Sequence, residues 1–170
     1  SGLVLVAAWW LYSVYVSLIQ KKNKVKEALA SIDVQLKKRY DLIPNVLFIA
    51  NKFMEHERSL IEDITKLRTE ALKLQGEDTV SQKMQLDKDI QSKMSQLMVS
   101  VENYPQLKSD NTMVQAMETY SEVEEHIAAS RRFYNASVLD LKNAVEIWPG
   151  SMLAQSLRIK SDLPYFEVTD

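Results

Sequence analysis

Apolar residues recur at alternating spacings of four and three through the first half of the chain, which is typical of a helix with one core-facing side. This first repeat has two charged members, Arg39 and Glu57. Its positions are Val25, Leu29, Ile32, Leu36, Arg39, Ile43, Val46, Ala50, Phe53, Glu57, Leu60, Ile64, Leu67, Ala71 and Leu74. Residues 3–19, just upstream, carry no charge. The pattern therefore predicts a membrane segment that continues into a long amphipathic helix.

Pro44 lies inside the first repeat. A proline lacks the backbone N–H and crowds the carbonyl four residues earlier, so it usually ends a helix. The repeat keeps its phase on both sides of Pro44, as expected of one kinked helix. We therefore predict a single bent helix over residues 3–75, with Gly76, Asp78 and Thr79 as cap, turn and start of a second helix.

The second helix is expected to run to about residue 103, where Tyr104-Pro105 interrupts the pattern. Its apolar positions include Met84, Met94 and Met98, which are either core residues or an adaptable groove for a partner. Ser109, Asp110 and Asn111 then offer capping side chains for a third helix.

The third helix has a repeat of its own over residues 117–148, called the third repeat below, which again holds two charges, Glu124 and Arg131. Its positions are Met117, Tyr120, Glu124, Ile127, Arg131, Tyr134, Val138, Leu141, Val145 and Trp148. Pro149 and Gly150 end this helix and leave an apolar-rich tail.

Helix lengths constrain how these helices meet. If the second helix folds back and the break at Pro105 is only a jog, the third helix continues toward the membrane. Glu124 then lies level with Arg39, and Trp148 lies level with about Val16. A reversal at Pro105 would push the third helix past the end of the first, with nothing to pack against. We therefore expect Arg39 to pair with Glu124, and Trp148 and the tail to return to the membrane interface.

The composition fits few, long elements, because 170 residues contain only three glycines and four prolines. We predict an all-α fold, in which a single N-terminal transmembrane helix continues into a long antiparallel helical bundle or coiled-coil-like rod. The expected divisions are a transmembrane helix at 1–20, a helical domain at 21–150 and an interfacial C-terminal tail at 151–170. The 21 basic and 23 acidic residues give no net charge that would recruit nucleic acid.

The uncharged start fits either a signal peptide core or a transmembrane helix. We favour the helix, because the segment runs directly into helix-forming sequence without a small-residue cleavage motif. A basic collar follows it, namely Lys21, Lys22, Lys24 and Lys26. By the positive-inside rule the collar places the C-terminal domain in the cytoplasm, and it also suits contact with anionic lipids. Trp148 and Phe166 are expected to be lipid-facing or interfacial.

The charged positions of the two repeats call for partners, because an unpaired charge inside a bundle costs several kcal/mol. Arg39, Glu57, Glu124 and Arg131 are interpreted as ion pairs that set the register of the helices, or as a polar layer that contacts another protein. His56 and His126 lack metalloprotease and di-iron spacing. With no cysteine and no glycine-rich phosphate loop, the sequence predicts no catalytic residue, cofactor or metal.

Several motifs along nearly the whole chain resemble the LemA family of bacterial membrane-anchored helical proteins. They are Tyr15-Val16-Ser17-Leu18, Ile32-Asp33-Val34-Gln35-Leu36-Lys37-Lys38-Arg39, Asp41-Leu42-Ile43-Pro44-Asn45, His56-Glu57, Glu102 with Tyr104-Pro105, Arg131-Arg132-Phe133-Tyr134-Asn135 and Tyr165-Phe166-Glu167. The resemblance implies one N-terminal membrane helix, an all-helical domain and a part in envelope or membrane organisation, with no established reaction.

From these observations we expect a non-enzymatic, membrane-anchored, homo-oligomeric scaffold at the bacterial inner membrane. Its partners would be membrane lipids and further copies of itself, with a membrane protease or another envelope protein as an additional partner. The alternative is an adapter that presents substrates to a membrane protease. A third class is a ligand-sensing bundle with an internal pocket.

Overall fold

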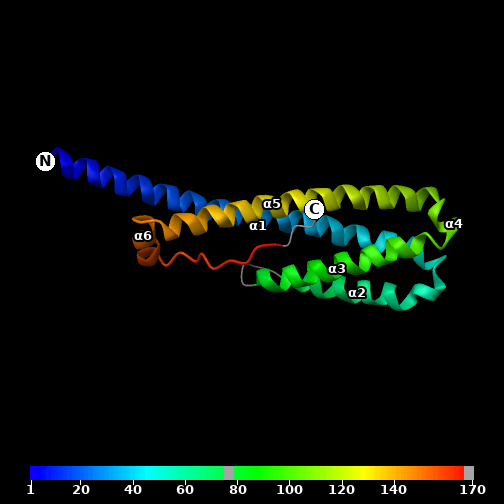
Figure 1. Ribbon diagram of the computed structural model, residues 1–170. Coiled ribbons are helices and arrows are strands. Elements are labelled where there is room, and N and C mark those ends of the chain that lie inside the picture. Colours follow the sequence, from blue (N-terminus) through cyan, green and yellow to red (C-terminus); the bar gives the residue numbers. More distant parts are fainter. Residues whose placement is uncertain (75–78, 167–170) are drawn as a thin grey trace. The chain divides into compact units, whose positions relative to one another are not determined.

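Every regular element in the computed structural model, which describes residues 1–74 and 79–166, is a helix (Figure 1). The elements are α1 (Gly2–Asn51), the 3-10 helix η1 (Glu55–Glu57), α2 (Arg58–Lys73), α3 (Val80–Val101), α4 (Pro105–Lys108), α5 (Asn111–Glu146) and α6 (Gly150–Leu157). The predicted all-α class and the long apolar first helix are confirmed.

The chain divides into two compact units. Residues 34–127 form one, the central unit, and residues 1–33 together with 128–170 form the other, the terminal unit. The repeats supply the interior of each unit. All positions of the first repeat from Val25 to Ala50 are buried, as are Tyr120, Ile127, Arg131, Tyr134, Val138 and Leu141 of the third.

Helix α1 continues through Pro44, as predicted. The proline side chain is exposed, and its missing N–H would leave the carbonyl oxygen of Tyr40 without its helical donor. Arg68 of α2 fills that role, because its Nε donates a hydrogen bond to the Tyr40 oxygen at 2.6 Å. A side chain from a second helix thus replaces the backbone bond that proline removes, while the bend expected there stays a prediction.

The expectation of one helix to residue 75 is wrong. Helix α1 ends at Asn51, and the chain reverses before α2 begins at Arg58. The bond between Arg68 and Tyr40 requires this reversal, because 28 residues of straight helix would hold them about 42 Å apart. The repeat passes through the break because Ala50, Glu57 and Ile64 are spaced by sevens, whether or not the backbone between them is helical.

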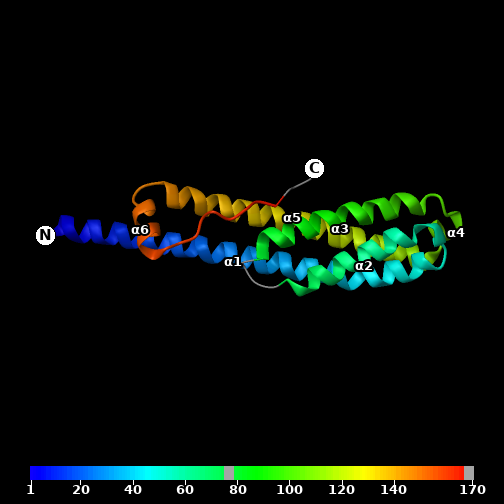
Figure 2. The same cartoon turned by 90° about the horizontal axis from the view of Figure 1, so that it is seen from below.

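The expected jog at Pro105 is also wrong. Helix α3 runs toward the short helix α4, and α5 returns from α4 in the opposite direction (Figures 1 and 2). The expectation of a jog assumed that the first helix reaches residue 75. Because α1 ends at Asn51 and the chain has already turned back once, α5 is not left without neighbours: it has buried residues from Met113 to Leu141. Asp110 caps α5 as predicted, since its Oδ1 accepts a hydrogen bond from the Met113 N–H at 3.0 Å. Of the other expected caps, Thr79 precedes α3, and Gly76 and Asp78 lie outside the described residues.

The apolar tail contains a helix that the sequence analysis missed. Helix α5 ends at Glu146, and α6 follows after a turn and runs across the direction of α1 and α5 in both views (Figures 1 and 2). Gly150 makes this turn possible, because a Cβ at this position would overlap the carbonyl oxygen of Ala144. Glycine is therefore required for α6 to pack against the end of α5.

The contact between Arg68 and the Tyr40 carbonyl can be tested with a double-mutant cycle. Arg68→Met should lower the free energy of unfolding by about 1–3 kcal/mol, because it leaves a carbonyl without its donor. The same change should cost less in a Pro44→Ala background, where the N–H of residue 44 supplies the helical bond. Urea unfolding followed by circular dichroism measures both costs. Equal costs in the two backgrounds would contradict this account.

Candidate functional site

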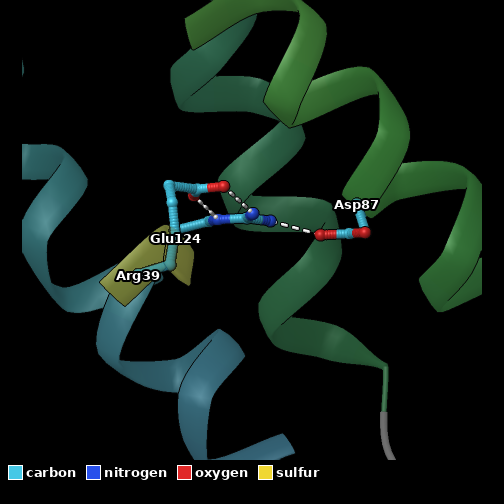
Figure 3. Close-up of polar contacts among 3 residues, drawn as sticks. All are labelled: Arg39, Asp87 and Glu124. Carbon is cyan, nitrogen blue, oxygen red and sulfur yellow. Dashed lines mark hydrogen bonds and ion pairs between the residues drawn. The ribbon is translucent and has the colours of Figure 1, made fainter. Parts of the chain in front are cut away.

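A charged layer, formed by Arg39, Asp87 and Glu124, joins three helices inside the central unit (Figure 3). Arg39 of α1 is fully buried. Its Nε and Nη2 donate to the two carboxylate oxygens of Glu124 on α5, at 2.5 and 2.7 Å. Its Nη1 donates to Oδ1 of Asp87 on α3. The predicted pair of Arg39 with Glu124 is present, and its geometry is the bidentate one that guanidinium and carboxylate groups favour.

Asp87 was not predicted as a member of the charged layer, although the sequence holds a signal for it. The buried positions of α3 alternate by three and four, and two of them, Lys83 and Asp87, are charged. The complete set is Val80, Lys83, Asp87, Ile90, Met94, Leu97 and Val101. The positions expected to face the core were apolar residues alone, so the pattern of threes and fours that includes Asp87 was not recognised.

Arg39, the cation of the layer, keeps its charge. Burial by itself would lower the pKa of Arg39, but the hydrogen bond to Glu124 and the charge of Asp87 outweigh it and raise that pKa above its usual value. Nearby, burial raises the pKa of the Tyr120 hydroxyl, the charge of Arg39 opposes this shift, and Glu124 adds to it. Arg39 therefore stays charged and Tyr120 stays neutral at any physiological pH.

The other two predicted charges lie elsewhere. Arg131 is buried on α5 in the terminal unit, as its place in the third repeat requires. Glu57 is half-buried at the end of η1, where the chain reverses, instead of inside a continuous helix. Ion-pair roles for these two residues stay predictions. His56 and His126 are both exposed.

An aromatic contact links α1 to the end of α5 in the terminal unit. The rings of Trp10 and Trp148 lie 6.0 Å apart between centroids and are tilted by 53°. Trp148 was expected level with Val16, so the contact lies six residues nearer the start of α1. Trp148 is nevertheless 67% exposed, and the apolar side chains around Trp10 on α1 are exposed as well.

Of the basic collar, Lys24 and Lys26 are exposed and Lys21 and Lys22 half-buried.

Phe166 corrects a prediction, because it is buried and not lipid-facing. Its ring packs edge-on against Tyr134 of α5, with centroids 5.3 Å apart. The side chain of Asn135 bonds both backbone groups of Phe166: its Nδ2 donates to the carbonyl and its Oδ1 accepts from the N–H, each at 2.8 Å. Lys142 Nζ lies 4.2 Å from the ring centre of Tyr165. These contacts hold the last described residues against α5.

These features define an all-helical protein with one helix, among those the structure describes, that is long and apolar enough to cross a membrane. The model of the LemA family matches residues 28–170, so the chain belongs to the LemA family. The match begins within α1, after its apolar segment. None of the curated proteins matches the sequence.

Removing one member of the charged layer should be far worse than removing all three. Arg39→Met leaves two carboxylates without their shared cation and is expected to cost about 3–5 kcal/mol of unfolding free energy. The triple variant Arg39→Met, Asp87→Leu, Glu124→Leu should cost much less, because the buried cation is removed together with both of its carboxylate partners. Chemical denaturation of the variants measures these costs.

The partly exposed pair of Lys93 and Asp63, 3.6 Å apart, is the matched control for the charged layer. Lys93→Ala should change stability by about 1 kcal/mol or less. Additive costs of the single changes in the layer would show that its three members act independently, contrary to this prediction.

Asn135 should decide whether the tail stays on α5. Asn135→Ala removes both hydrogen bonds to Phe166 and is expected to abolish protection of the Phe166 amide from hydrogen exchange. Asn135→Asp keeps the acceptor and should retain part of that protection. Asn143→Ala, on the same helix, serves as the control and should leave the amide protected. Unchanged protection in Asn135→Ala would show that ring packing alone holds the tail.

Proposed function

We propose that this protein is a non-enzymatic, membrane-anchored scaffold that works as a homo-oligomer at the bacterial inner membrane and helps to organise the envelope. The observation that carries the proposal is the continuity of α1, which runs as one helix from its exposed apolar segment to Asn51. Because the helix is continuous, its membrane segment would fix the distance and orientation of the folded domain relative to the membrane.

Anchoring is supported by the contrast between the two parts of α1. The side chains of Leu3 and Trp9 are 84% and 70% exposed, whereas the first repeat further along the helix is buried. An uncharged surface of this kind is unfavourable in water and suits a lipid environment. The basic collar that follows it favours a single-pass arrangement with the domain in the cytoplasm.

A structural role, rather than catalysis, is supported by how the polar groups of the central unit are used. Arg39 is paired with two carboxylates from different helices, so this buried charge serves to hold α1, α3 and α5 together. We propose that the units combine into an antiparallel helical rod, and that such rods associate side by side through their membrane helices. Ser13 and Ser17, four residues apart, would let two such helices approach closely.

The second candidate is an adapter that presents substrates to a membrane protease, and a groove between α3 and α5 favours it. The groove has a volume of about 330 Å³, and its lining includes Met98 and the exposed Glu125. A flexible methionine side chain next to an exposed carboxylate suits binding of a basic, partly apolar segment of another protein.

The scaffold proposal is tested by the native mass of the full chain in lipid nanodiscs. We expect a defined multiple of the 19.6 kDa chain. The variant Ser13→Ile, Ser17→Ile should keep membrane insertion but shift the mass to smaller species, because bulky side chains separate the helices. Ser92→Ile on α3 is the control and should leave the mass unchanged. A full chain that remains monomeric in the bilayer would reject the scaffold in favour of the adapter.

A further inference from the structure

The turn after α5 and helix α6 present an uncharged surface that the proposed scaffold does not yet explain. From Ile147 to Leu157 the chain contains no charged residue, and Glu146 and Arg158 border this stretch. Four of its apolar side chains are exposed to between 41% and 67%, namely Ile147, Trp148, Met152 and Leu157. So much exposed apolar surface within eleven consecutive residues is unusual for a protein surface in contact with water.

The structure fixes which side of α6 faces outward. Gly150 and Ala154, one turn apart, are buried, and Gly150 packs against the carbonyl of Ala144. Met152 lies on the opposite side of the helix and is exposed. The Ser156 hydroxyl on that outer side donates to the carbonyl of Met152 at 3.2 Å, so part of its polarity is satisfied within the helix. The outer side is thus free of charge and only moderately polar.

The contact with α1 assigns a depth to this surface. Trp148 packs on Trp10, which is part of an exposed aromatic group on α1 that also includes Trp9, Tyr12 and Tyr15. Tryptophan and tyrosine concentrate where the headgroups of a bilayer meet its acyl chains. Helix α6 also runs across α1 in both views, so it would lie flat in a membrane that α1 enters end-on (Figures 1 and 2).

We propose that residues 147–157 form an interfacial segment that lies in the headgroup–acyl boundary of a phospholipid bilayer. Through the contact of Trp148 with Trp10, the segment meets α1 within the uncharged stretch that precedes the basic collar. Arg158 has a left-handed backbone (φ 54°) and ends α6, after which the chain leads to Phe166 on α5. Positive charge therefore follows the uncharged stretch directly, where anionic headgroups can contact it. This inference rests on the proposed anchoring by α1.

The test uses nitroxide labels, which single cysteines can carry because the chain has no cysteine of its own. Labels are placed at Ile147→Cys and Met152→Cys in the interfacial segment. The two reference positions are Leu5→Cys in the apolar part of α1 and Ser92→Cys on the exposed surface of α3. The full chain is reconstituted in phosphatidylcholine–phosphatidylglycerol nanodiscs. The ratio of oxygen to nickel-chelate accessibility then reports the depth of each label.

We expect the ratio at positions 147 and 152 to lie well above that at 92 and below that at 5, as for shallow immersion. If positions 147 and 152 match 92 while 5 is immersed, the interfacial segment is rejected and anchoring by α1 stands. If 5 also matches 92, the anchoring proposal itself fails. If 147 and 152 are shielded from both reagents and show dipolar broadening between labels, a second copy of the chain covers this surface, which also overturns the proposal.

Discussion

The buried guanidinium of Arg39 is the constraint on which the arrangement of the central unit depends. Apolar repeats alone allow two helices to slide by a full heptad and still bury the same kind of surface. A charge that must meet two carboxylates does not allow this, because every other register leaves it unpaired in the interior. Asp87 and Glu124 come from different helices, so one side chain fixes the alignment of α1, α3 and α5 together. The layer therefore contributes to the choice of one structure more than to its net stability.

Two further kinds of contact hold the helices in place: side-chain hydrogen bonds to backbone groups, and the close approach of α6 to α5. Pro44 would normally interrupt α1, yet the helix continues because Arg68 supplies the missing donor to Tyr40. In the terminal unit, Gly150 lets α6 approach α5 and Asn135 binds both backbone groups of Phe166. Each device holds a segment whose apolar contacts alone would not specify its position. Together they give α1 the continuity, and α6 the fixed place, on which the proposed membrane functions rely.

The motifs by which the sequence resembles the LemA family acquire physical roles in this structure. Arg39 closes the first of the long motifs and forms the charged layer, and Pro44 lies in the next. Asn135 and Phe166, which are 31 residues apart in the sequence, belong to two of these motifs and bind one another directly. The family match covers residues 28–170, so it includes all four of these positions. These motifs therefore describe how the chain is held together, which suits the proposed structural role.

The sequence by itself determined that the chain is helical, which sides of α1 and α5 are buried, and that Arg39 needs an acidic partner. It did so because helical periodicity depends on neighbouring residues, and because buried charges need partners. The reversals after Asn51 and around Pro105, the role of Asp87 and the existence of α6 were decided only in the tertiary structure. Heptad phase shows which side of a helix is covered, but not what covers it or in which direction the next helix runs. The pair of Arg39 and Glu124 was predicted correctly only because two errors cancelled: the reversal after Asn51 was missed, and a jog was expected at Pro105 instead of a reversal. Chain reversals depend on contacts between segments far apart in sequence, such as Arg68 with Tyr40, and local patterns cannot contain that information.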